Sequence, residues 1–123
     1  MSRVEIEIPP NPVFAGVARL AVAALARSAG MDEERVEELK IAAGEACANA
    51  MLANEDTQAP VMLSWQESAE ALILEVKDRS TSGSSSDDRM ALSVALLETL
   101  VDDYERHPTD DGGTCARLSF HRG

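Results

Sequence analysis

The sequence predicts an α+β fold, a two-layer α/β sandwich in which helices cover one face of a mostly antiparallel sheet. Segments with the two-residue alternation of strands occur near both ends and in the middle, and segments with helical spacing lie between them. The two central strand segments are joined by only four residues, which is typical of an antiparallel hairpin. The sequence has no internal repeat, so residues 1–123 are expected to form a single domain.

The first half of the chain is expected to hold one strand and two long helices. Residues 4–8 alternate apolar side chains with glutamates, which predicts a half-buried strand. Asn11 followed by Pro12 is typical of a helix start, and the first helix is expected over residues 13–29, up to Gly30. The buried stripe of this helix is predicted to be Val17, Leu20, Ala21, Ala24 and Leu25.

A second helix is expected to begin after Asp32, a residue type that caps helix N-termini, and to continue to about Ala53. Apolar residues recur along it at three- and four-residue steps, which indicates a buried face. The predicted core face consists of Val36, Leu39, Ala43, Ala46, Cys47 and Ala50. Because Cys47 and Cys115 lack the spacing of a metal site or the density of a secreted scaffold, both are expected to be small buried residues in a reducing cytosol.

The second half is expected to contain the hairpin, a loop, a helix and one or two further strands. The hairpin strands are predicted over residues 61–66 and 72–77, and the leucines on both sides of Ile73 favour a central position for the second strand. Residues 79–88 are almost all polar and are expected to form a mobile loop. The helix, a turn and the last strand are predicted over residues 89–103, 107–113 and 114–120.

The charge balance indicates which partners the surface suits. With 22 acidic and 11 basic residues, the formal net charge is −11, which disfavours direct contact with DNA or RNA phosphates. The same charge would suit a partner with a basic face, or it would simply keep the chain soluble.

The most apolar window, residues 13–25, is too short to span a bilayer, and the N-terminus has no signal-peptide pattern. We therefore expect a cytoplasmic protein with no membrane partner.

One pair of polar residues on the second helix could carry chemistry. Glu45 and Asn49 are four residues apart, so they share a helical face, and their neighbours are nearly all small. A carboxylate can accept a proton from a hydroxyl group, and an amide oxygen can bind a hard cation such as Mg²⁺. Such a pair could form part of a phosphoryl-transfer site, although the same spacing also occurs on an ordinary solvated helix face.

The surrounding motifs resemble those of a known superfamily. The run EACANA, preceded by EELKIA, looks like the N-box of the histidine kinase-like ATPases, and it is most similar to that of the bacterial anti-sigma factor serine-protein kinases. The resemblance resumes at LEVKD, LLETLVDD and GGTCARL, and it covers the chain from about Val4 to Leu118. It implies the Bergerat (histidine kinase-like ATPase) fold, ATP and Mg²⁺ as cofactors, and a sigma factor or an anti-sigma antagonist protein as the partner.

The resemblance also implies roles for individual residues. Glu45 would be the general base toward a serine hydroxyl of the partner protein, and Asn49 would bind the Mg²⁺ that bridges the phosphates. Asp78 would accept a hydrogen bond from the adenine amino group, and Thr114 would support the same pocket. Arg19 would belong to the partner-binding surface, although a solvated arginine on a helix is an equally good interpretation.

The chain departs from the family pattern where the phosphates would bind. Both glycines of the first glycine box are absent after Asp78, and Gly83 comes one residue late. Ala91 and Ser93 stand where the second glycine box would place glycines, whose backbone N–H groups cradle phosphates. The serines at 84–86 could offer hydroxyl donors, but a run of serines is more typical of a solvated linker.

Three functions therefore stay open. The chain could be an anti-sigma factor that also phosphorylates an antagonist on serine, a non-catalytic binding module with a degenerate ATP site, or a sensor or adaptor domain. Protein binding is expected in all three cases. Relatives often dimerise, and the alanine-rich first helix would permit a homodimer, although its apolar stripe is also needed for the core.

Overall fold

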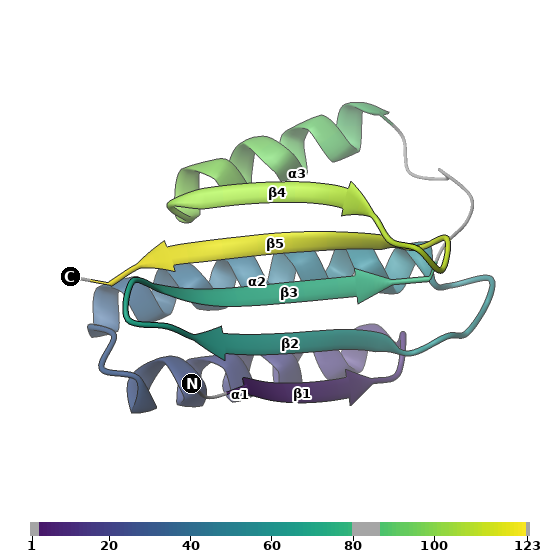
Figure 1. Cartoon of the computed structure of the whole chain (residues 1–123). Helices are drawn as coiled ribbons and strands as arrows, with labels where there is room; N and C mark the ends of the chain where they lie inside the picture. The colour runs from purple at the N-terminus through teal and green to yellow at the C-terminus, as the bar shows by residue number, and fades with distance from the viewer. Residues whose placement is uncertain (1–2, 80–86, 123) are drawn as a thin grey trace.

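The computed structural model describes residues 3–79 and 87–122. Within them a five-stranded antiparallel sheet forms one layer, and three helices form the other (Figure 1). The elements, in chain order, are β1 (Arg3–Ile8), the short 3₁₀ helix η1 (Pro12–Phe14), α1 (Ala15–Ser28), α2 (Glu33–Ala53), β2 (Val61–Glu67), β3 (Ala71–Asp78), α3 (Asp87–Leu100), β4 (Asp103–Pro108) and β5 (Thr114–His121). The predicted α+β sandwich is confirmed.

The strand order is β1-β2-β3-β5-β4, so β3 lies in the centre of the sheet, as its continuous apolar run predicted. The predicted hairpin is also confirmed, because β2 and β3 pair antiparallel with Leu63 opposite Val76. β5 then lies between β3 and β4, and its Leu118 is paired with Leu74. This order brings the end of β3 and the start of β5 side by side, although the two segments are far apart in the sequence.

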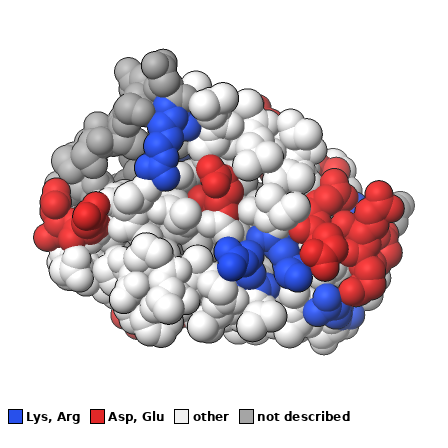
Figure 2. Space-filling view, turned by 180° about the vertical axis from the view of Figure 1, so that it is seen from behind, with Lys and Arg blue, Asp and Glu red and all other residues white. Residues whose placement is uncertain are grey.

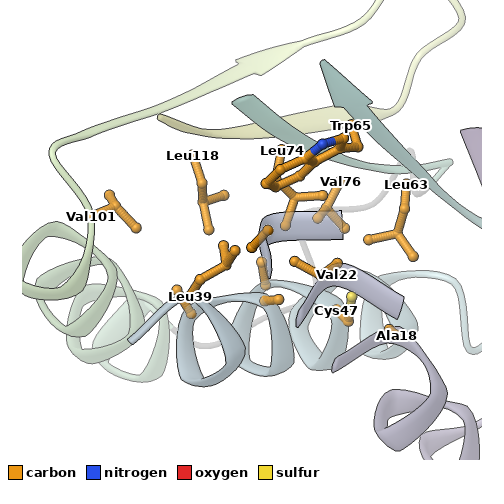
Figure 3. Packing of buried hydrophobic residues seen from close by; sticks show 14 of the residues in the cluster. Ala18, Val22, Leu39, Cys47, Leu63, Trp65, Leu74, Val76, Val101 and Leu118 are labelled. Atoms are coloured by element: carbon orange, nitrogen blue, oxygen red, sulfur yellow. The ribbon is translucent and has the colours of Figure 1, made fainter. Parts of the chain in front are cut away.

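The hydrophobic core fills the space between the sheet and α2. Trp65, Leu74 and Leu118 extend from the strands toward Leu39 of the helix layer (Figure 3). The core is mostly aliphatic, as the low aromatic content of 3% requires. Cys47 lies in this core, and burial raises the pKa of its thiol from 9.0 to about 12.

α2 agrees closely with its prediction. Asp32 caps its N-terminus, where one carboxylate oxygen accepts a hydrogen bond from the backbone N of Arg35 at 3.0 Å. Every residue of the predicted core face is buried. The small side chains on this face allow the helix to lie close to both the sheet and α1.

The buried stripe predicted for α1 was wrong. Val17 and Leu20 are 51% and 69% exposed, and Ala24 is also exposed. The residues that α1 does bury are Ala18, Val22, Ala23 and Ala26. α1 packs against α2, and an alanine-rich face lets two helices approach more closely than a leucine-bearing face would. Val17 and Leu20 consequently face outward, whereas Val22 is buried and Leu25 packs at the edge of the core.

The boundaries in the last third of the chain also differ from the prediction. α3 spans Asp87–Leu100 rather than residues 89–103, and the chain then enters β4, which pairs with β5. Pro108 ends β4, so the predicted turn over residues 107–113 begins later than expected. Because β4 is an edge strand with mostly exposed side chains, it needs no apolar alternation. Most of the predicted mobile loop, residues 80–86, lies outside the described residues.

Candidate functional site

A cavity of about 490 Å³ opens between α2, α3 and the ends of β3, β4 and β5. Its volume falls within the range of about 300–1,000 Å³ that is typical of small-molecule sites. Each of the five elements contributes a polar side chain to the lining: Asn49 from α2, Asp78 from β3, Arg89 from α3, Arg106 from β4 and Thr114 from β5. Glu55 and Asp56, in the connection after α2, add two further carboxylates, so the lining combines two cations and three carboxylates with an amide and a hydroxyl.

Asp78 is held at the end of β3 by its partner strand. The side chain is only 8% exposed, and its Oδ1 accepts a hydrogen bond from the backbone N of Thr114 at 3.2 Å. Asp78 and Thr114 are also paired in the strand register. A buried carboxylate with a fixed oxygen is suited to accept a further hydrogen bond from a ligand.

Gly113 allows this close approach of the two strands. A Cβ at this position would lie 2.0 Å from the carbonyl oxygen of Asp78, which is far inside van der Waals contact. The backbone N of Gly113 donates a hydrogen bond to Thr109 Oγ1 at 3.0 Å, which fixes the turn before β5. Glycine is therefore required here for space beside Asp78.

Asn54 fixes the same end of the cavity, and the sequence did not indicate it. Its side chain is fully buried, and Nδ2 donates to the carbonyl oxygens of Ala59 and Pro60 at 2.9 and 3.2 Å. Its Oδ1 accepts from the backbone N of Arg79 at 2.8 Å. One amide thus ties the end of α2 to the chain on both sides of the hairpin. An asparagine after a helix looks like an ordinary turn residue, so only the tertiary contacts reveal this role.

Asn49 makes a contact that joins the two helices at the cavity. Its Nδ2 donates to Ser93 Oγ at 2.6 Å, and Ser93 itself is only 4% exposed. Ser93 occupies one of the positions at which the sequence lacks an expected glycine. This partner of Asn49 was also missed, because helical spacing does not show which residues of two different helices face each other.

The structure brings Asn49, Asp78 and Thr114 together, but it places Glu45 and Arg19 elsewhere. Glu45 is half-buried one turn before Asn49, and it is not among the described residues that line the cavity. The Arg19 side chain lies across α2 at Gly44, where an added Cβ would be 3.1 Å from Arg19 Cδ. Glu45 is therefore one helical turn from the lining, and Arg19 packs across α2 on the helix-covered side of the molecule.

A family model for the histidine kinase-like ATPase domain matches residues 8–120. The chain belongs to the histidine kinase-like ATPase family. This confirms the resemblance seen in the N-box and in the strand that ends at Asp78.

Serine-protein kinases named RsbW are among its relatives. The enzyme of Bacillus velezensis is 27% identical over an alignment that covers 98% of this chain and 86% of that protein. The enzyme of Bacillus pumilus is 42% identical over 48 residues, which are 39% of this chain and 30% of that protein.

The fold also has a solved counterpart. A crystal structure of the RsbU and RsbW domains of a Mycobacterium tuberculosis protein matches 98% of this chain with a TM-score of 0.76. Sequence identity is 18%, and this chain corresponds to 32% of that longer one. The likeness shows that the fold is shared.

Proposed function

We propose that this chain is an RsbW-type regulatory protein that binds ATP with Mg²⁺ in the cavity and controls a sigma factor by direct contact. The observation that carries the nucleotide part is that Asn49, Asp78 and Thr114, which are distant in the sequence, line one cavity. The RsbW relatives support the regulatory part. The same likeness supports a cytoplasmic location, and no helix among the described residues is long and apolar enough to cross a membrane.

The donor set of the cavity fits a magnesium nucleotide. The described residues contain no cluster of three or more His, Cys, Asp or Glu side chains that could hold a metal ion by itself. Mg²⁺ often takes only one or two protein ligands when phosphate oxygens complete its shell, and the amide oxygen of Asn49 could supply one. Bound Mg²⁺ would neutralise phosphate charge. Asp78 would hold the adenine amino group, and Arg89 and Arg106 would place positive charge in the lining.

The proposed transfer to serine needs Glu45 as a base next to, rather than inside, the cavity. Glu45 makes no ion pair with another described residue, so its carboxylate is available to a hydroxyl group brought by a partner protein. A partner serine would then receive the phosphoryl group at the cavity mouth, while its proton passes to Glu45.

A second candidate is a binding module without catalysis, and a specific observation favours it. Ala91 and Ser93 lie inside α3, which begins at Asp87, and not in a loop. Backbone N–H groups beyond the first four residues of a helix are already bonded to carbonyl oxygens, so they cannot cradle phosphates. Phosphate binding would then depend on the backbone N–H groups in the first turn of α3 and on Arg89 and Arg106.

Isothermal titration with ATP and Mg²⁺ tests the nucleotide site. We expect saturable binding by the wild-type chain and a loss of at least about 10-fold in affinity for Asp78→Asn, because a hydrogen bond to a charged group contributes about 1.5–3 kcal/mol. Asparagine keeps an oxygen for the N of Thr114, so the variant is expected to fold. Asp56→Asn, an exposed carboxylate in the lining of the same cavity, is the matched control and should bind normally. No wild-type binding at millimolar ATP would favour the non-catalytic module.

A further inference from the structure

The hydrogen bond between Asn49 and Ser93 joins two helices at the wall of the cavity. Asn49 Nδ2 lies 2.6 Å from Ser93 Oγ. Asn49 is half-buried and lines the cavity, whereas Ser93 is 4% exposed. The serine hydroxyl therefore sits behind the amide and supports it from the protein side.

This contact fixes which end of the amide is available to a ligand. An asparagine side chain is planar, with the donating NH₂ and the accepting oxygen on opposite sides. When Nδ2 is held by Ser93, Oδ1 has a fixed direction, and among the described residues no hydrogen-bond donor occupies that oxygen. A rotated amide would instead present its NH₂ group, which repels a cation. In the observed arrangement Ser93 Oγ accepts from Nδ2, so the bond holds the amide with Oδ1 on the opposite side, where it can bind a metal ion.

We propose that Ser93 is a positioning residue that holds the Asn49 amide oxygen toward Mg²⁺ bound with the nucleotide. This inference rests on the proposed function. It assigns a task to a residue that stands where the resemblance expects glycine. A glycine has no hydroxyl group, so in this chain the side chain at position 93 does something that the family pattern does not supply. Partners that orient metal ligands commonly change metal affinity by about 10- to 100-fold when they are removed.

The test is a comparison of ATP affinity with Mg²⁺ and with EDTA, by isothermal titration, for wild type and Ser93→Ala. We expect Ser93→Ala to weaken ATP binding by about 10-fold in Mg²⁺ and to leave binding in EDTA unchanged. A purely structural role would lower both affinities together or only the Tm. Alanine is the best helix former, so the variant is expected to fold. Thr99→Ala is the matched control, because Thr99 is an exposed hydroxyl residue of the same helix whose Oγ1 donates to the carbonyl oxygen of Ala95.

A double-mutant cycle tests whether Ser93 affects Mg²⁺-dependent ATP binding through Asn49. In an Asn49→Ala background, Ser93→Ala should cause no further loss of Mg²⁺-dependent affinity, because there is no amide left to orient. An additive loss would overturn the positioning role.

The outcomes separate this inference from the proposed function. If wild type binds ATP more tightly with Mg²⁺ and Ser93→Ala keeps the full Mg²⁺ effect, the role of Ser93 is wrong while the nucleotide site stands. If wild type does not bind ATP, or binds it equally in Mg²⁺ and EDTA, both are overturned. Slow exchange of the Asn49 side-chain NH₂ protons in NMR spectra, lost in Ser93→Ala, would independently support the hydrogen bond.

Discussion

At the scale of single residues, the site depends on residues that take no part in chemistry themselves. Gly113 and Asn54 neither donate a proton nor bind a cofactor, yet one leaves room for β5 beside Asp78 and the other ties three backbone groups at the end of the cavity. Both act on the position of Asp78 and the chain that follows it. The position of the Asp78 carboxylate is therefore fixed by its neighbours.

Gly113→Ala should destabilise the protein and weaken nucleotide binding together. The new methyl group would lie 2.0 Å from the carbonyl oxygen of Asp78, so β3 and β5 would have to separate. We expect a loss of about 1–3 kcal/mol in the free energy of unfolding, measured by urea denaturation. Gly16→Ala is the control, because its Cβ would meet only Arg19 Nη2 at 3.8 Å. A Gly113→Ala protein as stable as wild type would contradict the close approach.

At the scale of elements, α1 presents an apolar surface that the fold does not use. Val13, just before the helix, and Val17 and Leu20 within it are 71%, 51% and 69% exposed. Figure 2 shows that the helix side of the molecule is mostly uncharged with some basic side chains, while acidic side chains gather at the end where α2 begins. We propose that this surface, Val13, Val17 and Leu20, binds the sigma factor. This surface would be covered by apolar side chains of the partner, and the net charge of −11 over the whole chain would favour a partner with a basic face, such as a DNA-binding sigma factor.

Leu20→Asp should weaken sigma-factor binding by at least about 10-fold without lowering the Tm. The side chain is exposed, so the fold does not depend on it, whereas a charge in an apolar contact is costly to desolvate. Leu92→Asp on α3, at a leucine that is 75% exposed, is the matched control. The measurement is a titration of the purified sigma factor that co-purifies with the chain. If Leu20→Asp instead abolishes self-association or antagonist binding alone, the surface belongs to that partner and our assignment is wrong.

At the scale of the whole molecule, stability rests on an aliphatic core that encloses a thiol. Cys47 is buried among helix and strand residues, and Cys115 is buried on β5. Burial raises the pKa values of the two thiols from 9.0 to about 12 and about 11, respectively, and the nearby Glu75 adds to the effect at Cys115. The folded protein therefore keeps both thiols protonated under conditions in which exposed thiols ionise.

The free energy of unfolding should fall as the pH rises from about 9 toward 12. Between these values the unfolded chain releases thiol protons and the folded chain keeps them, so ionisation favours unfolding. Denaturation curves at pH 8 and pH 10 measure this effect, and it should be smaller in Cys47→Ala. At pH 8 the native thiols should react with a thiol reagent only as fast as the protein opens. Rapid labelling of both cysteines in the native state would contradict their burial.

The sequence by itself determined the fold class, the hairpin, α2 and the family motif. In α2 the residues that become buried recur at three- and four-residue steps along the whole helix, and Asp32 marks its start. In α1 both faces are apolar. The buried face was decided by the fit of alanines against α2, which is a property of two helices together and not of one.

Only the tertiary structure decided how the site is assembled. Asn49, Asp78 and Thr114 were each named from the motif, but the strand order β3-β5-β4 and the packing of α3 brought them to one cavity and gave Asn49 its partner Ser93. The sequence left open whether one or two strands follow α3 and did not place β4, since an edge strand with mostly exposed side chains leaves no hydrophobic alternation to detect. Local sequence patterns indicate which face of each segment is buried. Contacts between distant segments depend on the strand order and on how the helices pack on the sheet, and these are determined by the whole chain.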